Sequence, residues 1–184
     1  FATVDEAARA AKAAQPVFAA LPLKRRAAIL AAIRETMMAS AEALARSAHE
    51  ETGLGRVEDK VVKNRLVTEK TPGLEDLHPT AVTGDHGLSL IEPAPFGVIG
   101  AITPSTNPTS TIICNAIGML AAGNSVVFCV HPLAKRCSME TVALLNRAIT
   151  GAGGPPAVVT WLSSPSAEPA QQMMAHPLVR LLVV

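Results

Sequence analysis

The stretch that decides the fold is Glu92-Pro-Ala-Pro-Phe-Gly-Val-Ile-Gly-Ala-Ile-Thr-Pro-Ser-Thr-Asn-Pro-Thr-Ser-Thr111, continued by Ala121-Ala-Gly-Asn-Ser-Val-Val-Phe128. It predicts a buried strand, a tight polar turn, a helix and a second buried strand, which together make the front half of a nucleotide-binding sheet. The turn Thr103-Pro-Ser-Thr-Asn-Pro108 gathers hydrogen-bond donors and acceptors at the carboxyl end of the first strand. Because ligands of open α/β sheets bind outside the carboxyl ends of the strands, this turn is the first candidate for a binding site.

Further strands and helices alternate after this stretch. Runs rich in Val, Ile and Leu predict strands at 96–103, 124–130, 157–162 and 178–184, and the segments between them predict helices at 107–122, 133–150 and 165–175. Strands that are apolar along their whole length are typical of a sheet covered on both faces. Strands that alternate with helices predict a parallel sheet with right-handed crossovers.

The amino-terminal part predicts three helices. Thr3 and Glu6 have the spacing of a capping box at the start of an Ala-rich helix that ends at about Gln15. Pro22 begins a longer helix that ends at Thr52-Gly53, and a third helix covers about 57–69. Along the second helix, apolar residues recur every three or four positions and predict one buried face: Leu23, Ala27, Leu30, Ile33, Met37, Ala41, Leu44 and Ala48.

A hairpin separates the helices from the sheet. Two short apolar segments, 81–83 and 88–91, flank Gly84-Asp-His-Gly87, which is a turn signal between paired strands. The predicted fold class is therefore α/β: a Rossmann-like parallel sheet with an N-terminal helical layer and a protruding β-hairpin. We expect residues 1–80 to form the helical part of a nucleotide-binding domain, 81–95 the hairpin, and 96–184 the first half of the sheet.

Composition excludes several classes of function. The 16 basic and 15 acidic residues are interspersed and give a net charge of +1, so bulk charge does not attract nucleic acid or an anionic membrane. Aromatic residues make up only 3% of the chain, which argues against stacking of bases. No apolar run has transmembrane length, and the first residues lack the pattern of a signal peptide. The three cysteines have no metal-ligand spacing and fit a reducing, cytoplasmic setting, so we expect no metal site.

Asn107 is the side chain in the polar turn that most suggests chemistry. It stands at the N-cap position of the predicted helix, with Pro108 at the first helical position. One interpretation is that it only caps the helix. The other is that its amide, beside a helix N-terminus, donates a hydrogen bond to a developing oxyanion. Both can hold, because an amide carries one acceptor and two donors.

Several motifs resemble the aldehyde dehydrogenase superfamily: Pro95-Phe-Gly-Val-Ile-Gly100, the 103–111 turn, Ala122-Gly-Asn-Ser-Val-Val-Phe128, His131-Pro132 and Ala134-Lys135. The resemblance is greatest to the CoA-acylating branch, the acetaldehyde and propionaldehyde dehydrogenases of ethanolamine and propanediol metabolism. Segments that match this branch are Glu51-Thr-Gly-Leu-Gly-Arg56, Asp59-Lys60 with Lys63-Asn64, 69–77, and Ala152-Gly-Gly-Pro-Pro156. Non-acylating members usually carry Pro-Trp-Asn in the turn, whereas this chain has Pro104-Ser-Thr-Asn107.

The resemblance implies roles for particular positions. Asn107 matches the asparagine that holds the thiohemiacetal oxyanion. The residues expected to contact the nicotinamide half of the cofactor are Ile102, Thr103, Pro104 and Ser105. Cys129 stands where non-acylating members have a lysine that binds the adenosine ribose, and the missing charge fits a site that exchanges NADH for coenzyme A. His131 and Pro132 would lie near the adenosine end, where His131 could equally be a structural cap; Lys135 and Arg136 could attract a phosphate or simply form a solvated helix face.

The implied activity is that of the N-terminal portion of an enzyme that oxidises a short-chain aldehyde to an acyl-CoA, with NAD and coenzyme A. The nucleophilic cysteine of the family lies in a separate, later domain. Cys114, Cys129 and Cys137 lie in apolar surroundings and are expected to be packing residues. Two alternatives stay open: a non-acylating aldehyde dehydrogenase, and a truncated, non-catalytic module that binds cofactor or only assembles with other subunits.

The resemblance also implies partners and location. The hairpin at 81–95 resembles the family's oligomerisation arm, so we expect a homo-oligomer of the full-length parent. An isolated two-stranded ribbon is only marginally stable, which is consistent with a partner for it. We expect neither nucleic acid nor membrane as a partner. The expected location is cytoplasmic, and enclosure in a bacterial microcompartment is an open alternative.

Overall fold

A four-stranded parallel sheet forms the centre of the fold. The structure is a computed structural model, and it describes all residues from 1 to 184. The strands of the sheet lie in the order β5-β4-β3-β6. They are β3 (Val98–Ile102), β4 (Ser125–Cys129), β5 (Val159–Trp161) and β6 (Val179–Val183). The predicted α/β class and parallel sheet are confirmed, and each strand lies inside its predicted range.

The strand order reverses direction at β3. The chain runs from β3 through α4 (Pro108–Ala121) to β4, and through α5 (Lys135–Gly151) to β5, always outward on one side. It then returns through α6 (Ala167–Met174) and places β6 on the opposite side of β3. Such a reversal opens a crevice at the carboxyl ends of the two strands that flank it.

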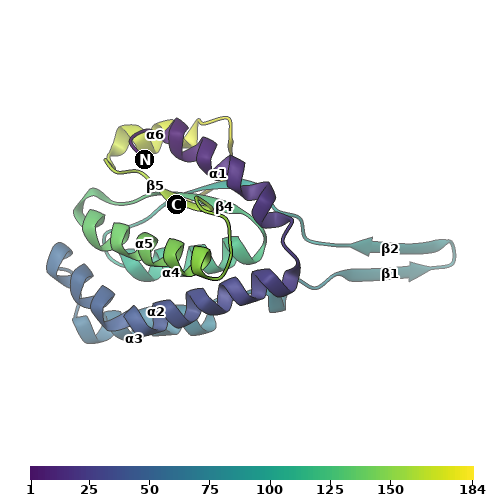
Figure 1. Cartoon of the computed structure of the whole chain (residues 1–184), viewed down its shortest axis with the longest axis horizontal. Helices are drawn as coiled ribbons and strands as arrows, with labels where there is room; N and C mark the ends of the chain where they lie inside the picture. The colour runs from purple at the N-terminus through teal and green to yellow at the C-terminus, as the bar shows by residue number, and fades with distance from the viewer.

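Helices cover both faces of the sheet (Figure 1). The first helix, α1 (Val4–Ala19), lies with α6 on one face, and α4 and α5 lie on the other. Outside α4 and α5, the long α2 (Leu23–Thr52) and α3 (Val57–Lys70) form the additional helical layer that the sequence predicted. None of these helices combines the length and the apolar character that crossing a membrane would require.

Alternate residues of β4 enter two different apolar clusters. Val126 and Phe128 belong to the main core, which they share with residues of α2, α4 and α5. Val127 and Cys129 belong to a smaller cluster with residues of α1. All five residues of β4 are buried, so the unbroken apolar run in the sequence is explained by the helices on both faces.

The buried face of α2 differs from the predicted one at its start. Residues from Leu30 to Ala48 in the predicted stripe are buried, but Leu23 is 63% exposed and Ala27 is also exposed. Arg26 is buried instead, because its guanidinium donates to the carbonyls of Ala19 and Ala121 at the carboxyl ends of α1 and α4. The cationic side chain of Arg26, which hydrogen-bonds carbonyls at two helix ends, is therefore buried in place of the apolar side chains that the periodicity predicted.

The start of α1 is as predicted, and its end is not. Glu6 N donates to Thr3 Oγ1 (3.2 Å), while Thr3 N donates to the Glu6 carboxylate (3.3 Å), which completes the capping box. The helix continues beyond the predicted end, through Pro16 to Ala19. Phe18 is fully buried in the main core, and this burial outweighs the backbone hydrogen bond that Pro16 cannot donate.

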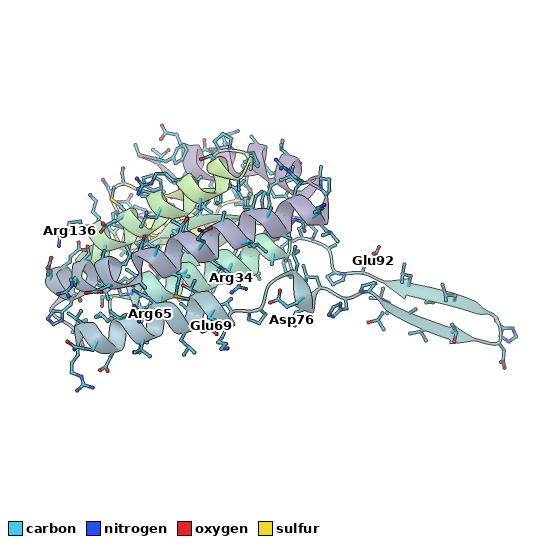
Figure 2. The ribbon with its side chains drawn as sticks, turned by 60° about the horizontal axis from the view of Figure 1, so that its bottom comes forward. Arg34, Arg65, Glu69, Asp76, Glu92 and Arg136 are labelled. Carbon is cyan, nitrogen blue, oxygen red and sulfur yellow. The ribbon has the colours of Figure 1, made fainter.

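The hairpin projects away from the body of the molecule (Figures 1 and 2). It consists of β1 (Thr80–Gly84) and β2 (Gly87–Ile91), paired antiparallel around the predicted turn. Every residue of both strands is exposed, including Val82, Leu88 and Leu90. Figure 2 shows Asp76, in the short helix η1 (Leu74–Asp76), and Glu92 on either side of the hairpin's base.

Candidate functional site

A hollow of about 560 Å³ lies at the point where the strand order reverses. Residues from the carboxyl ends of β3 and β6 form two of its walls, and the amino-terminal half of α4 and the segment after β4 complete it. The lining residues are Ile102, Thr103, Pro104, Thr111, Asn115, His131, Val183 and Val184. Because ligands of open α/β sheets bind at such a reversal, this hollow is the best candidate for a cofactor pocket.

Thr103 gives this hollow a polar group without a protein partner. Its backbone N–H donates to Cys129 O (3.2 Å), which fixes the start of the turn beside β4. The residue is only 2% exposed, and its buried Oγ1 has no hydrogen-bond partner. Buried hydroxyl groups are almost always hydrogen-bonded in folded proteins, so this oxygen is unusual. Because it is buried, a ligand in the hollow would reach it only after the Thr103 side chain rotated.

His131 combines the two interpretations that the sequence left open. Its Nδ1 accepts a hydrogen bond from Leu133 N (3.1 Å) and caps the short helix η2 (Pro132–Ala134). Since Nδ1 is the acceptor, the neutral ring carries its proton on Nε2. The side chain also lines the hollow. His131 is therefore a structural cap whose ring still offers a donor, whereas Pro132 begins η2 and does not line the hollow.

Asn107 lies in a second, adjoining hollow of about 300 Å³. It stands at the predicted N-cap position of α4, but its side chain makes no capping hydrogen bond, so the purely structural interpretation is wrong in this respect. Its Oδ1 instead accepts a hydrogen bond from Lys63 Nζ (3.0 Å). The lining residues are Lys63, Leu66, Val67, Asn107, Ser110, Thr111, Cys114 and Asn115. Thr111 and Asn115 border both hollows, which makes them neighbours.

The structure does not bring all the predicted cofactor residues together. Ile102, Thr103, Pro104 and His131 line the larger hollow, but Ser105 and Cys129 do not. The Cys129 side chain is buried in the cluster beneath α1, on the sheet face away from α4. A ribose contact of Cys129 therefore stays a prediction, and its side chain would have to move to make that contact.

None of the three cysteines has the environment of an activated nucleophile. Burial raises the pKa of Cys129, and burial together with the nearby Glu51 carboxylate raises the pKa of Cys137 to about 12. Cys114 is half-buried and lines the smaller hollow, with no base hydrogen-bonded to it. Nucleophilic cysteines need thiolate character, so these residues match the predicted packing role.

The amino terminus of α5 is already occupied. The Glu51 carboxylate accepts hydrogen bonds from the backbone N–H groups of Arg136 (2.7 Å) and Cys137 (2.8 Å). Partial burial raises the pKa of Glu51, but the hydrogen bonds from both amides and from the Cys137 side chain, with the charge of Arg136, together outweigh burial, and the pKa lies below its usual 4.5. A phosphate at the amino terminus of α5 would have to displace this carboxylate. The side chains of Lys135 and Arg136 are exposed, as in the solvated-face interpretation, and a phosphate contact of these side chains stays a prediction (Figure 2 shows Arg136 at the end remote from the hairpin).

Glu51→Gln is expected to lower the free energy of unfolding at neutral pH by about 1 kcal/mol, since it removes a charged cap that solvent still partly screens. Because the folded-state pKa is lowered, the stabilisation is complete above pH 4.5 and is lost as the pH falls through the folded-state value. Urea unfolding at several pH values should therefore show wild type and variant converging in acid. The control is Glu50→Gln, whose side chain makes only a long ion pair with Arg136 (3.9 Å); an equal effect there would contradict the capping role.

Nine residues that line the two hollows were not among the predicted site residues: Lys63, Leu66, Val67, Ser110, Thr111, Cys114, Asn115, Val183 and Val184. A signal for two of them was present. Asn107, Thr111 and Asn115 recur every four residues along an otherwise apolar helix, which places them on one face. Lys63 is different, because it is 44 residues from its partner Asn107 and no local pattern links the two.

Comparisons with known proteins give similarities in sequence and in overall fold. An acetylating acetaldehyde dehydrogenase of Bilophila wadsworthia is 49% identical over 184 residues, which is all of this chain and 38% of that protein. The propionaldehyde dehydrogenase of Rhodopseudomonas palustris, solved with bound propionyl-CoA, is 50% identical with a TM-score of 0.96 over 99% of this chain and 41% of that one. A propionaldehyde dehydrogenase of the Clostridium phytofermentans fucose utilisation bacterial microcompartment is 49% identical, also with a TM-score of 0.96, over 99% and 42% of the two chains.

The chain thus spans about two fifths of the length of these relatives. The family model described as "Aldehyde dehydrogenase family" matches residues 2–184, almost the entire sequence. The resemblance found in the polar turn and in the segments around it therefore extends from the first helix to the last strand. This chain belongs to the aldehyde dehydrogenase family.

Proposed function

We propose that this chain is the N-terminal part of a CoA-acylating aldehyde dehydrogenase, which converts a short-chain aldehyde, NAD and coenzyme A into an acyl-CoA and NADH. The observation that carries the proposal is a pair of adjoining hollows, one at the sheet reversal and the other between α3 and α4. One is lined by residues of the polar turn and of β6, and the other is lined by Asn107 and residues of α3 and α4. A redox cofactor and a carbonyl substrate need such neighbouring sites, because hydride passes directly between them.

The larger hollow is the proposed cofactor site. Ile102, Thr103 and Pro104 would contact the nicotinamide half, and Thr103 Oγ1 would hydrogen-bond a polar group of the ligand once its side chain had rotated toward the hollow. Ser105 stands in the same turn, while Cys129, His131 and Pro132 follow along β4 toward the proposed adenosine end. The cofactor supplies one chemical function, which is to accept the hydride from the aldehyde carbon. The residues of this chain hold and orient it.

The smaller hollow is the proposed aldehyde site. A cysteine thiolate from the remainder of the enzyme attacks the aldehyde carbon, and the carbonyl oxygen becomes an oxyanion. Asn107 Nδ2, which has no hydrogen-bond partner within the chain, donates to this oxyanion. Loss of hydride from the carbon then yields a thioester. The thiol of coenzyme A loses its proton to solvent and attacks the thioester through its sulfur, and the cysteine leaves as its thiolate while the acyl-CoA forms.

Transfer to coenzyme A distinguishes this proposal from hydrolysis by a non-acylating enzyme. The turn reads Pro104-Ser-Thr-Asn107 where non-acylating members usually have Pro-Trp-Asn, and the buried, neutral Cys129 replaces their ribose-binding lysine. The similarity to an acetylating enzyme and to one solved with bound propionyl-CoA supports the same branch.

The hairpin is the proposed subunit contact. Its exposed apolar side chains and unpaired strand edges would be covered by a second copy of the full-length protein, which makes the proposed assembly a homo-oligomer. We propose a cytoplasmic location. The similarity to a microcompartment enzyme supports enclosure in such a compartment as a specific form of that location.

The test is a set of steady-state assays on the purified full-length protein, whose intact mass is measured first. Propionaldehyde, NAD and coenzyme A together should produce NADH and propionyl-CoA in equal amounts, and omission of coenzyme A should abolish sustained turnover. Equal rates without coenzyme A, with propionate as product, would identify the non-acylating enzyme. Absence of turnover in a full-length protein that still binds NAD would favour the non-catalytic module. Comparison of the rates with NAD and with NADP shows which of the two nucleotides the enzyme uses.

A further inference from the structure

One face of α3 holds the polar turn at three points. Lys60, Lys63 and Asn64 have the spacing i, i+3 and i+4, which places their side chains side by side on the helix. Lys60 Nζ donates to Thr106 O (2.9 Å), Lys63 Nζ donates to Asn107 Oδ1 (3.0 Å), and Asn64 Oδ1 accepts from Thr109 Oγ1 (2.9 Å). The three partners, Thr106, Asn107 and Thr109, are almost consecutive, so α3 contacts the whole junction between the turn and α4.

The outer two contacts fix the position of α3 relative to the turn. Lys60 is 6% exposed, Asn64 1% and Thr109 2%, so these hydrogen bonds are shielded from competing water. Asn64 Nδ2 also donates to Ala41 O of α2 (3.1 Å), and Arg34 of α2 donates to the carbonyls of Thr68 and Thr71 at the end of α3. The turn is thus attached through α3 to the longest helix of the fold (Figure 2 shows Arg34 on α2 facing α3).

The middle contact determines which way the Asn107 amide faces. An ammonium group has only donors, so the atom of the amide that meets Lys63 must be the carbonyl oxygen. A flipped amide would place its NH₂ group against the ammonium and lose this hydrogen bond. With Oδ1 held by Lys63, the NH₂ group is on the opposite side of the amide and has no partner in the chain.

We propose that Lys63 is a positioning residue that holds the Asn107 amide with its NH₂ group available to a carbonyl oxygen in the smaller hollow. This inference rests on the proposed function. Lys63 also lines the smaller hollow, but the proposed action is on the Asn107 amide and not on the substrate. It keeps the donor in one orientation before the aldehyde arrives, and the positive charge on the amide oxygen's side makes the N–H groups better donors.

The test uses the full-length enzyme with Lys63→Met, which keeps the length of the side chain and removes the donor. Misorientation of a group that acts on the transition state should lower kcat about 10- to 100-fold, with a smaller change in the KM for aldehyde. Lys63→Arg retains a donor and should recover most of the loss. Lys70→Met is the matched control, because Lys70 is on the same helix and pairs only with Glu69, so its kcat should stay near that of wild type.

A double-mutant cycle separates positioning from a general structural role. If Lys63 acts through the Asn107 amide, Lys63→Met should cause no further loss of kcat in the Asn107→Ala background. Equal losses of kcat in the wild-type and Asn107→Ala backgrounds, or a wild-type kcat in Lys63→Met, would overturn the inference about Lys63. The proposed function would still stand in that case if the wild-type enzyme had acylating activity. Failure of the wild-type enzyme to use coenzyme A would instead reject the function itself.

Discussion

Asn107→Ala in the full-length enzyme is expected to lower kcat by about 10²–10³-fold, the loss typical of removing one oxyanion donor. The amide has no capping role, because its side chain makes no hydrogen bond to the backbone of α4. Its loss should therefore leave the fold in place and affect the transition state, where negative charge develops on the aldehyde oxygen. The measurement is the initial rate of NADH formation at saturating aldehyde, with the KM for aldehyde determined beside it.

Two further variants sharpen this prediction. Asn107→Asp keeps the shape and can still accept from Lys63, but it has no N–H donor and adds a charge of the wrong sign, so its kcat should be at least as low. Thr106→Ala changes the neighbouring side chain and keeps the carbonyl that Lys60 contacts, so its kcat should match wild type. A near-normal kcat in Asn107→Ala would rule out the oxyanion role.

Phe128→Ala is expected to destabilise the chain by about 3–5 kcal/mol. Phe128 is fully buried in the middle of β4, between β3 and β5, and belongs to the main core formed with α2, α4 and α5. The truncation removes an aromatic ring from a site closed on every side, so the surrounding residues cannot collapse into the space. The cost therefore includes the lost burial and the cavity that remains.

The measurement is the free energy of unfolding from urea titrations, compared at an unchanged slope so that the two transitions report the same surface exposure. Phe96→Ala is the matched control, because Phe96 is 62% exposed and its truncation should change stability by no more than about 0.5 kcal/mol. Similar losses in the free energy of unfolding for Phe128→Ala and Phe96→Ala would show that the destabilisation does not come from burial in the main core.

Much of the fold could be predicted from the sequence, because its signals are local. The strands are unbroken apolar runs, and burial on both faces requires such runs wherever helices cover a parallel sheet. Thr3 and Glu6 predicted the start of the first helix, because the capping box that they form is complete within four residues. Periodicity failed where a distant group decided the outcome: Arg26 is buried because two other helices end beside it.

The site was less predictable, because its geometry depends on residues far apart in the chain. The sequence placed Asn107 at a helix start, but only the packing of α3 against the turn shows that Lys63 takes the amide oxygen and leaves no capping bond. Side chains along a strand alternate between the two faces of the sheet, and the Cys129 side chain lies on the face covered by α1. Because every position of this strand is apolar or buried, the sequence did not show which face Cys129 would take. The order of the strands, and with it the position of the larger hollow, likewise needed the folded sheet.

The reversal at β3 has a consequence for how the protein matures. Val183 and Thr103 face the same hollow although about 80 residues separate them, and they meet only when β6 pairs with β3. A nascent chain that has completed β3, β4 and β5 therefore lacks the larger hollow. A ligand that occupies the hollow binds only after the crossover has closed, and by mass action it stabilises the finished sheet over partly folded forms.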